Sequence, residues 1–389
     1  MFLKETCKQC GTCLSQCPFI EMPIEKAKLE ISLMIQKGVS KEIVRNCAGC
    51  SYCDIVCPTQ SNPSLLRKEI LLKQSRDKGV VCLPIISEEM PLNLMSIGLE
   101  FEKEKKLKDL NVYSNPSPSK EVFYLGCSLS YIYTDLAQTK LLEPLPMVGG
   151  MRFCCGGYVH HNCEEETTRI KGRKLLQELK RVGIEKMITF CPGCDRMIGK
   201  VYPGIIPEFN IENVNIVQYL LEQYYNGKIE FSNPLNQRMT FHDSCAWRNM
   251  ESEVHENPRK LLEAMGAEIL EMKHNRKESM CCGAPLTVRN PQLADSIAEK
   301  RVLEAKETGA QAIVISCTGC FALAGKAKEH NMDIYNITEL AQIAVGEKPP
   351  HRIIEIQNQL RNDLMKKISE NPDVLNDRYR IEGGDIRRL

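Results

Sequence analysis

Ten cysteines of this chain stand in a five-thiol pattern that occurs twice in the same order. Each copy has a single cysteine, then an adjacent pair followed by glycine, then a Cys-x-x-Cys motif. The first copy consists of Cys127, Cys154, Cys155, Cys191 and Cys194. The second copy consists of Cys245, Cys281, Cys282, Cys317 and Cys320. A fold for this chain has to bring five thiols together twice.

Length, charge and cysteine content narrow the class of protein. With 389 residues the chain is long enough for two or three domains with buried cores. A net charge of +1 and an aromatic content of 6% give no case for a nucleic-acid partner. We expect a cytoplasmic protein without a membrane span of its own, because there is no secretory signal pattern and no apolar run near ~18 residues. In such a reducing compartment, the 20 cysteines favour metal binding or catalysis over disulfides.

The first 60 residues hold a different cysteine pattern, again in two copies. Each copy reads Cys-x-x-Cys-x-x-Cys-x-x-x-Cys-Pro, over residues 7–18 and 47–58. In such runs three cysteines bind one 4Fe–4S cluster and the fourth binds the other cluster. One predicted ligand set is Cys7, Cys10, Cys13 and Cys57, and the other is Cys17, Cys47, Cys50 and Cys53. Two zinc sites are the alternative, which we disfavour because zinc loops supply cysteines in pairs. The stretch resembles a bacterial-type two-cluster ferredoxin, an electron relay that needs a donor and an acceptor.

The chain around and after these runs has a different character. Residues 21–44 and 64–78 are predicted as helices, and residues 79–86 as a short strand. A mixed charge run at 100–110 predicts a solvated helix face, with a partner-docking patch as the alternative. Prolines and serines at 114–119 indicate a domain boundary near residue 120.

Strand and helix signals alternate after residue 120. Strands are predicted for the apolar runs at 122–125, 187–190, 239–241 and 312–315. Helices are predicted at 170–182, 215–223, 294–308 and 336–345. This alternation predicts α/β lobes with parallel sheets. The repeat is unequal, because 26 residues separate Cys127 from Cys154 and 35 separate Cys245 from Cys281.

We therefore expect an α+β protein overall, with a helical two-cluster ferredoxin domain followed by two pseudo-repeated α/β cysteine-rich lobes. The expected ferredoxin domain covers 1–78 and a linker covers 79–120. The first and second cysteine-rich domains are expected at 121–232 and 233–346. Residues 347–389 are expected to form a charged C-terminal tail, partly helical and on the surface.

Each repeat places its thiols where they suit a metal centre. The Cys-x-x-Cys motif lies where a strand ends and a helix begins, and the backbone N–H groups there stabilise thiolates. An adjacent Cys–Cys pair makes a strained disulfide but can offer two sulfurs to one metal centre. Gly156 and Gly283 allow the backbone to turn sharply beside that centre. Five thiolates exceed the four of an ordinary cubane, so either one thiol is spare or the cluster is not an ordinary cubane.

The doubled pattern resembles the cysteine-rich domain of heterodisulfide reductases and related iron–sulfur oxidoreductases. The likeness covers about residues 1–345 and is especially clear at residues 242–245, 257–262 and 281–283. It implies that the five cysteines of each copy hold one noncubane 4Fe–4S cluster, and that a substrate disulfide is split between the two clusters. A ferredoxin domain ahead of two such repeats is similar to a single-chain fusion of that family's C-type and B-type subunits. The family usually has more than 26 residues between its first cysteine and its Cys–Cys pair. The first copy here has 26, so the departure concerns the first cluster.

A few candidate residues lie outside these sets. Cys82 and Cys163 are expected to be buried small hydrophobes rather than reactive thiols. His160 and His161 are candidate catalytic proton donors to a leaving thiolate, with ordinary loop histidines as the alternative. His242 is a candidate hydrogen-bond donor to a cluster sulfur. No glycine-rich nucleotide fingerprint precedes a helix, so a flavin or nicotinamide is expected on another subunit.

These observations and the resemblance favour an iron–sulfur subunit of a multi-subunit oxidoreductase, with two cubane and two noncubane 4Fe–4S clusters. In the first hypothesis, electrons pass from the ferredoxin clusters to the repeat clusters, which reduce or form the disulfide of a small thiol substrate. In the second, the chain is a non-catalytic relay that links a flavoprotein dehydrogenase or an acyl-CoA reductase complex to a ferredoxin or quinone pool. Both hypotheses need a flavin- or haem-bearing partner subunit, through which the chain could associate with a membrane.

Overall fold

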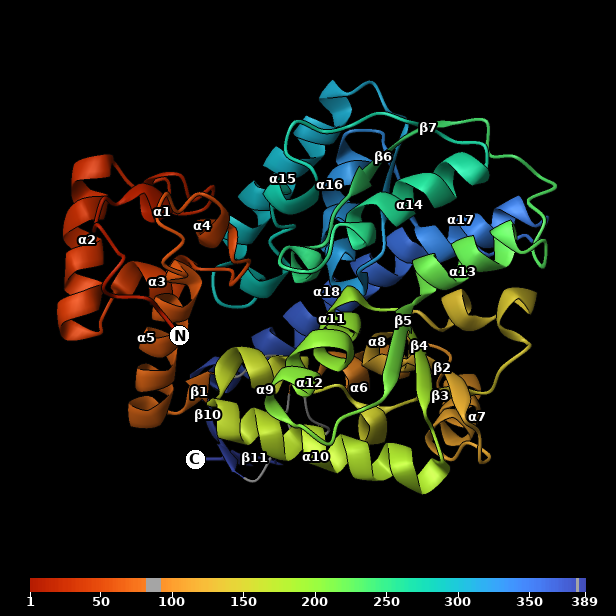
Figure 1. Ribbon diagram of the computed structural model, residues 1–389, viewed down its shortest axis with the longest axis horizontal. Helices are drawn as coiled ribbons and strands as arrows, with labels where there is room; N and C mark the ends of the chain where they lie inside the picture. Colours follow the sequence, from red (N-terminus) through yellow and green to blue (C-terminus); the bar gives the residue numbers. More distant parts are fainter. Residues whose placement is uncertain (82–91, 383–384) are drawn as a thin grey trace.

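The computed structural model describes residues 1–81, 92–382 and 385–389. Figure 1 shows an N-terminal helical segment beside two larger bodies, one above the other, each built on a sheet. We call residues 1–78 the N-terminal segment, and name the two bodies the first lobe and the second lobe in chain order. Within the described ranges, no helix is both long and apolar enough to cross a bilayer. The exact domain boundaries expected above stay a prediction.

The N-terminal segment is a small bundle of five helices. They are α1 (Thr12–Ser15), α2 (Ile24–Lys37), α3 (Lys41–Asn46), α4 (Tyr52–Ile55) and α5 (Pro63–Lys78). The helix expected at 21–44 is interrupted because Gly38 ends α2 in the left-handed region, with φ 63°. Ser40 then begins α3 by accepting a hydrogen bond from the N–H of Ile43. Apolar side chains of α2 and α5, such as Ile31 and Ile70, form its core.

The two lobes contain four-stranded parallel sheets with the same strand order. The first sheet runs β3-β2-β4-β5 and the second runs β7-β6-β8-β9. The strands of the first sheet are β2 (Glu121–Leu125), β3 (Met147–Gly149), β4 (Lys186–Thr189) and β5 (Glu212–Asn215). Those of the second are β6 (Arg238–His242), β7 (Glu268–Ile269), β8 (Ala312–Ile315) and β9 (Asp333–Asn336). The expected α/β lobes with parallel sheets are thus confirmed, as is the repeat.

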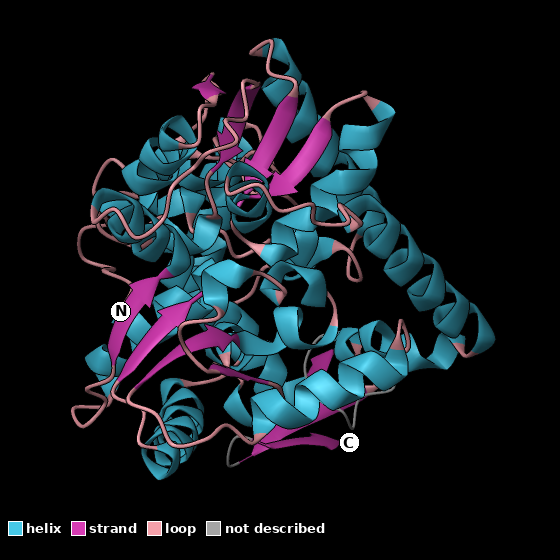
Figure 2. Ribbon diagram, turned by 90° about the vertical axis from the view of Figure 1, so that its right-hand side faces the viewer, coloured by secondary structure: helices cyan, strands magenta, loops and turns pink. Residues whose placement is uncertain are grey.

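Helices cover both faces of each sheet, as parallel sheets require. In the first lobe they are α8 (Gly126–Tyr131), α9 (Gly157–Asn162), α10 (Glu165–Val182), α11 (Pro192–Arg196), α12 (Tyr202–Ile205) and α13 (Ile216–Tyr225). In the second they are α14 (Glu253–Ala264), α15 (Pro291–Glu307), α16 (Ala324–Glu329) and α17 (Ile337–Ala344). Alternate residues of β2 face different cores: Val122 and Tyr124 pack with α10, whereas Phe123 and Leu125 join a core that continues into the second lobe. Figure 2 shows the two sheets with helices between and around them.

Two stretches outside the sheets are packed more closely than the sequence indicated. Part of the expected linker forms α6 (Leu94–Leu99) and α7 (Lys103–Ser114), which pack against α8. In the charge run, residues 102–105 are exposed as expected, but Lys106 is buried and its Nζ donates to the carbonyls of Gly98 and Ile132 at 2.8 and 3.2 Å. The C-terminal stretch forms α18 (Ile353–Glu370), whose Leu360 and Leu364 lie in the shared core.

The end of the chain pairs with the short strand that follows the N-terminal segment. β10 (Arg378–Glu382) runs antiparallel to β11 (Asp385–Arg388) and to β1 (Val80–Val81). β1 begins the strand expected at 79–86, whose later residues lie outside the described part of the chain, as does Cys82.

Candidate functional site

Four cysteines of the N-terminal segment surround one cavity. The structure brings together the first set expected from the spacing: Cys7, Cys10, Cys13 and Cys57 all line the cavity. Burial, and then the nearby thiols of Cys57, Cys7 and Cys10, raise the pKa of Cys13 to about 12. Thiols so close together become thiolates together only when a cation lies among them, which is what a metal centre supplies.

The second expected set, Cys17, Cys47, Cys50 and Cys53, is also gathered in one place. Burial, and among the neighbouring thiols that of Cys47, raise the pKa of Cys17 to about 11. Burial, then Asp54 and the thiols of Cys47 and Cys50, raise the pKa of Cys53. The fourth cysteine of each run therefore lies with the other run, as the crossed arrangement predicts.

The five cysteines of the first lobe contact one another in an unbroken series. Their side chains meet in the order Cys127, Cys154, Cys155, Cys194 and Cys191. The Sγ atoms of Cys194 and Cys155 are 3.3 Å apart. Despite its shorter spacing, the first repeat gathers all five thiols.

The second lobe repeats this series. The side chains meet in the order Cys245, Cys281, Cys282, Cys320 and Cys317. Three of them, Cys281, Cys282 and Cys320, are almost fully buried. The ten thiols therefore form two matching groups, which we call the first and second thiol groups.

The sheet topology explains why the thiols gather there. In both sheets the first strand of the lobe lies beside its third, and the connection changes direction between them. Side chains that follow such a pair of strands meet in the crevice at the carboxyl edge of the sheet. Cys127 and Cys191 follow β2 and β4, and Cys245 and Cys317 follow β6 and β8. The Cys–Cys pairs then reach the same edge from the loop after the second strand of each lobe.

The two thiol groups touch each other. The thiols of Cys191 and Cys317 lie side by side across the lobes. Beside them, Trp247 Nε1 donates to Asp195 Oδ2 at 2.6 Å, so the residue after Cys194 is tied to the turn that carries Cys245. This buried bond fixes the two groups relative to one another.

The second thiol group also adjoins the N-terminal segment. Burial, and then the nearby thiol of Cys245, raise the pKa of Cys50 to about 12. Arg248 lies between these regions: its Nε donates to the Cys50 carbonyl at 2.8 Å, and its guanidinium carbon is 5.3 Å from the centre of the Tyr52 ring. Its charge favours the thiolate forms of both Cys50 and Cys245.

The thiols fit iron–sulfur groups rather than disulfides. Every cysteine that the structure describes is a free thiol, although many lie in contact with another. Each group presents an all-sulfur donor set at one buried place, the donor chemistry of iron–sulfur clusters. The ligand assignment itself stays a prediction.

The remaining sequence candidates have different outcomes. Cys163 is buried as expected. His160 and His161 lie on α9, with ring centres 5.7 Å apart. Burial, and then the charges of Lys68 and Arg196, lower the pKa of His160 to about 3, so this ring stays neutral near pH 7. A role for either histidine as proton donor stays a prediction.

Sequence reasoning missed two buried arginines, Arg248 and Arg301. Each is 1% exposed. Arg248 lies in the turn after Cys245, whereas Arg301 is on α15 and donates from Nε to Nδ1 of His242 at 2.9 Å. The signal available in the sequence was an arginine on an apolar helix face, because Arg301 lies between Ile297, Val302 and Ala305.

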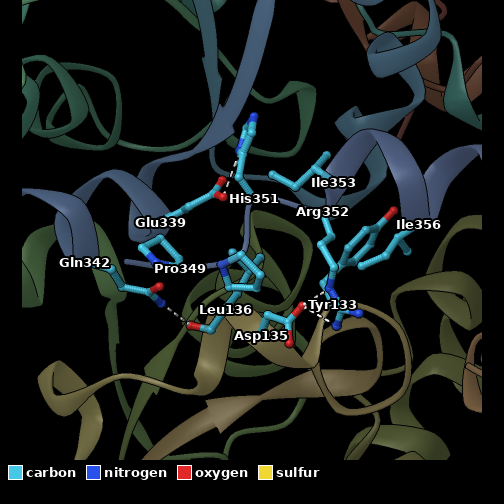
Figure 3. Close-up of a pocket in the computed structure, with 11 residues that line it drawn as sticks. Tyr133, Asp135, Leu136, Glu339, Gln342, Pro349, His351, Arg352, Ile353 and Ile356 are labelled. Atoms are coloured by element: carbon cyan, nitrogen blue, oxygen red, sulfur yellow. Dashed lines mark hydrogen bonds and ion pairs between the residues drawn. The ribbon is translucent and has the colours of Figure 1, made fainter. Parts of the chain in front are cut away.

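A separate cavity lies between the first lobe, α17 of the second lobe and the C-terminal stretch (Figure 3). Arg352 pairs there with Asp135 at 2.8 Å, and His351 Nδ1 lies 2.9 Å from Glu339 Oε1. Tyr133, on its wall, lies near Cys317 of the second thiol group.

Comparison with known proteins places the two repeats in a family. The cysteine-rich domain family, CCG, matches residues 122–199 and 239–323. One relative is a chain of the dihydromethanophenazine:CoB–CoM heterodisulfide reductase of Methanosarcina barkeri, 28% identical over 244 residues, which are 58% of this chain and 59% of that protein. Another is a chain of the fumarate reductase (CoM/CoB) of Methanothermobacter marburgensis, 25% identical over 88% of this chain and 72% of that protein.

A third relative is a different kind of enzyme. The EtfAB:quinone oxidoreductase of Syntrophomonas wolfei is 24% identical over 78% of this chain. This chain spans only 46% of that protein's length and 59% of the length of the Methanosarcina barkeri relative. These three relatives are named as reductases or oxidoreductases. The chain therefore contains two CCG cysteine-rich domains and is homologous to a heterodisulfide reductase component and to related iron–sulfur oxidoreductases.

Proposed function

We propose that this chain is the subunit in which electrons from a flavin- or haem-bearing partner reach a disulfide. Electrons would enter at two cubane clusters of the N-terminal segment and pass to two noncubane clusters, one in each thiol group. The carrying observation is that Cys50 of the N-terminal segment lies near Cys245, and that Cys317 and Cys191 lie side by side, so the cysteine sets follow one another from the segment into both lobes.

The proposed reaction is the two-electron reduction of a disulfide, or its reversal. Two electrons and two protons convert one disulfide into two thiols. The clusters, when bound, supply the one-electron steps, and the protein's own part is to hold two of them side by side. The Cys191–Cys317 contact and the Trp247–Asp195 bond keep the two groups together, so that both sulfurs of one disulfide could be met at once.

Iron analysis and EPR spectroscopy test this proposal. Four clusters require about 16 Fe per chain, whereas about eight would leave the thiol groups without clusters. Thiols of the candidate substrate are then added to the oxidised protein. The disulfide-reducing proposal expects a thiol to change a cluster EPR signal and expects the reduced protein to cleave the matching disulfide. If about 16 Fe are found but no thiol or disulfide has an effect, the catalytic proposal fails.

That last outcome would favour the second candidate, a relay without a substrate of its own. The likeness to the EtfAB:quinone oxidoreductase supports this candidate, because it extends over 78% of the chain without implying a disulfide. In that case the clusters would exchange electrons with a flavoprotein and a quinone or ferredoxin pool. Electron transfer from a reduced flavoprotein to the chain, with no thiol present, would be its positive test.

A further inference from the structure

His242 ends β6 beside the second thiol group. Its side chain is 1% exposed. A ring nitrogen of His242 and the Sγ atoms of Cys282 and Cys320 all lie within 4.8 Å of one another. His242 is not one of the five cysteines of the second thiol group, and its ring lies next to them.

Arg301 decides which nitrogen of this ring carries the hydrogen. The Nε–H of Arg301 donates to Nδ1 of His242 at 2.9 Å, and an arginine side chain can only donate. Nδ1 must therefore accept, and the hydrogen of the neutral ring is on Nε2. Nε2 is buried and has no nitrogen or oxygen partner among the described residues.

The arginine is itself held in place. Its guanidinium donates to Glu304 Oε2 at 2.8 Å, to the His274 carbonyl at 2.9 Å and to Ser279 Oγ at 3.1 Å. With these bonds made, turning the imidazole over would cost the Arg301 bond. The bonds that hold Arg301 therefore also hold the Nε2–H of His242 toward the second thiol group.

The first lobe has no such donor at the matching position. Tyr124 pairs with Thr189 in the first sheet, and His242 pairs with Ile315 in the second. Thr189 and Ile315 each lie two residues before the Cys-x-x-Cys motif of their lobe. Tyr124 is therefore the counterpart of His242, but its hydroxyl donates to the carbonyl of Phe153. Gly183 and Gly309 end the corresponding helices of the two lobes. Leu175 lies as far before Gly183 as Arg301 lies before Gly309, so Leu175 is the counterpart of Arg301.

We propose that His242, oriented by Arg301, donates its Nε2–H to a sulfur of Cys282 or Cys320 and makes the second-lobe cluster easier to reduce than the first-lobe cluster. Reduction adds negative charge to a cluster, and a hydrogen bond to its sulfurs stabilises that charge. His242 is a positioning and tuning residue in this account. The inference rests on the proposed function only in requiring that both thiol groups hold clusters.

One consequence concerns the order in which the two lobe clusters accept electrons. The second thiol group is the one that adjoins Cys50, so the cluster next to the entry point is also the better electron acceptor. The two halves of the pseudo-repeat would then differ in role: the second-lobe cluster takes up the first electron, and the first-lobe cluster is reduced only at a lower potential.

Pulsed EPR of the reduced wild-type protein, labelled with ¹⁵N-histidine, tests the hydrogen bond directly. The second-lobe signal is identified as the one lost in Cys320→Ala. We expect this signal to show coupling to histidine nitrogen and to a hydrogen that exchanges in D₂O, and we expect the first-lobe signal to show neither. Loss of iron from the thiol groups would overturn the proposed function instead, so the two failures are distinguishable.

An EPR-monitored redox titration of three variants tests the effect on potential. His242→Phe should lower the midpoint potential of the second-lobe signal, and His242→Gln, which keeps an N–H donor, should restore part of it. The mirror variant Tyr124→Phe should leave that potential unchanged. An unchanged potential in His242→Phe, or the absence of histidine coupling in a wild-type protein with full iron, would overturn the inference. If His242→Phe fails to assemble, the wild-type coupling still decides.

Discussion

At the scale of single residues, the glycines after the two Cys–Cys pairs look alike but have different neighbours. Both have left-handed backbones, with φ 67° at Gly156 and 85° at Gly283. A Cβ on Gly283 would lie 2.7 Å from the carbonyl oxygen of Ala294, which α15 holds rigidly. A Cβ on Gly156 would lie 2.6 Å from Cγ of Lys171, which a change of the lysine rotamer can move, and 3.0 Å from the hydroxyl of Tyr202.

We expect both glycine-to-alanine substitutions to be destabilising, but unequally. The left-handed backbone alone costs an alanine about 1 kcal/mol. Gly283→Ala should lose more than that, together with iron from the second group, because the Ala294 carbonyl cannot move aside. Apparent melting temperature and iron content of Gly156→Ala and Gly283→Ala are the measurements. An equal or larger loss in Gly156→Ala would contradict the role given to the α15 backbone.

The sequence predicted single thiols better than their polar surroundings. The cysteine spacing predicted which thiols come together, and the structure gathers all four expected sets. The spacing could not show that Arg301 reaches His242, because these residues are 59 positions apart and meet only in the folded chain. Lys106 was expected on a solvated face for the same reason, since its carbonyl partners come from separate turns.

At the scale of elements, apolar strands and long amphipathic helices were predictable and short edge strands were not. β8 (Ala312–Ile315) is buried at every residue and appears in the sequence as an apolar run. β5 and β7 have exposed or half-buried residues and little apolar pattern, so only their pairing to β4 and β6 defines them as strands. The C-terminal stretch is charged overall, and only its contacts show that α18 packs into the core.

A pair that joins the C-terminal stretch to α17 of the second lobe should respond to pH. The Glu339 carboxylate, bonded to His351, raises the pKa of that imidazole, and Asp333 adds to the rise. Tyr335 stacks on the ring at 4.3 Å. A raised folded-state pKa gives stability that is fully present below the unfolded pKa of about 6.5 and is lost as the pH rises through the folded value.

His351→Gln should therefore reduce the free energy of unfolding at pH 6 and have little effect at pH 9. The pair is partly exposed, so the expected loss at pH 6 is at most about 1 kcal/mol. Urea unfolding of the wild type and the variant, followed by circular dichroism without oxygen, measures the difference at each pH. A gap between the two proteins that widens toward pH 9 would mean that the charged pair is not the source.

At the scale of the whole molecule, the cations by which the second lobe contacts the N-terminal segment include the buried Arg248, the half-buried Arg289, which donates to the Cys47 carbonyl, and the exposed Lys300. Arg248 is buried, and in the described part of the chain its guanidinium donates to the backbone carbonyls of Cys50, Lys277 and Ser279. Lys300 forms an exposed ion pair with Glu21 at 2.5 Å across the same interface. Two net-negative clusters on either side of Arg248 would supply the countercharge that a buried cation needs.

Removing the buried cation should slow electron transfer from the N-terminal segment to the lobes. A charge effect of a few kcal/mol is expected at close range, so Arg248→Met should slow the transfer at least about tenfold. Arg248→Lys, which keeps the charge, should restore part of the rate, and Lys300→Met should leave it nearly unchanged. The measurement is stopped-flow reduction of the fully loaded protein, with the thiol-group signals followed by rapid-freeze EPR. If Lys300→Met slows the transfer as much as Arg248→Met, or if Arg248→Lys is no faster than Arg248→Met, the interface acts by docking alone and the charge of Arg248 has no part in the electron route.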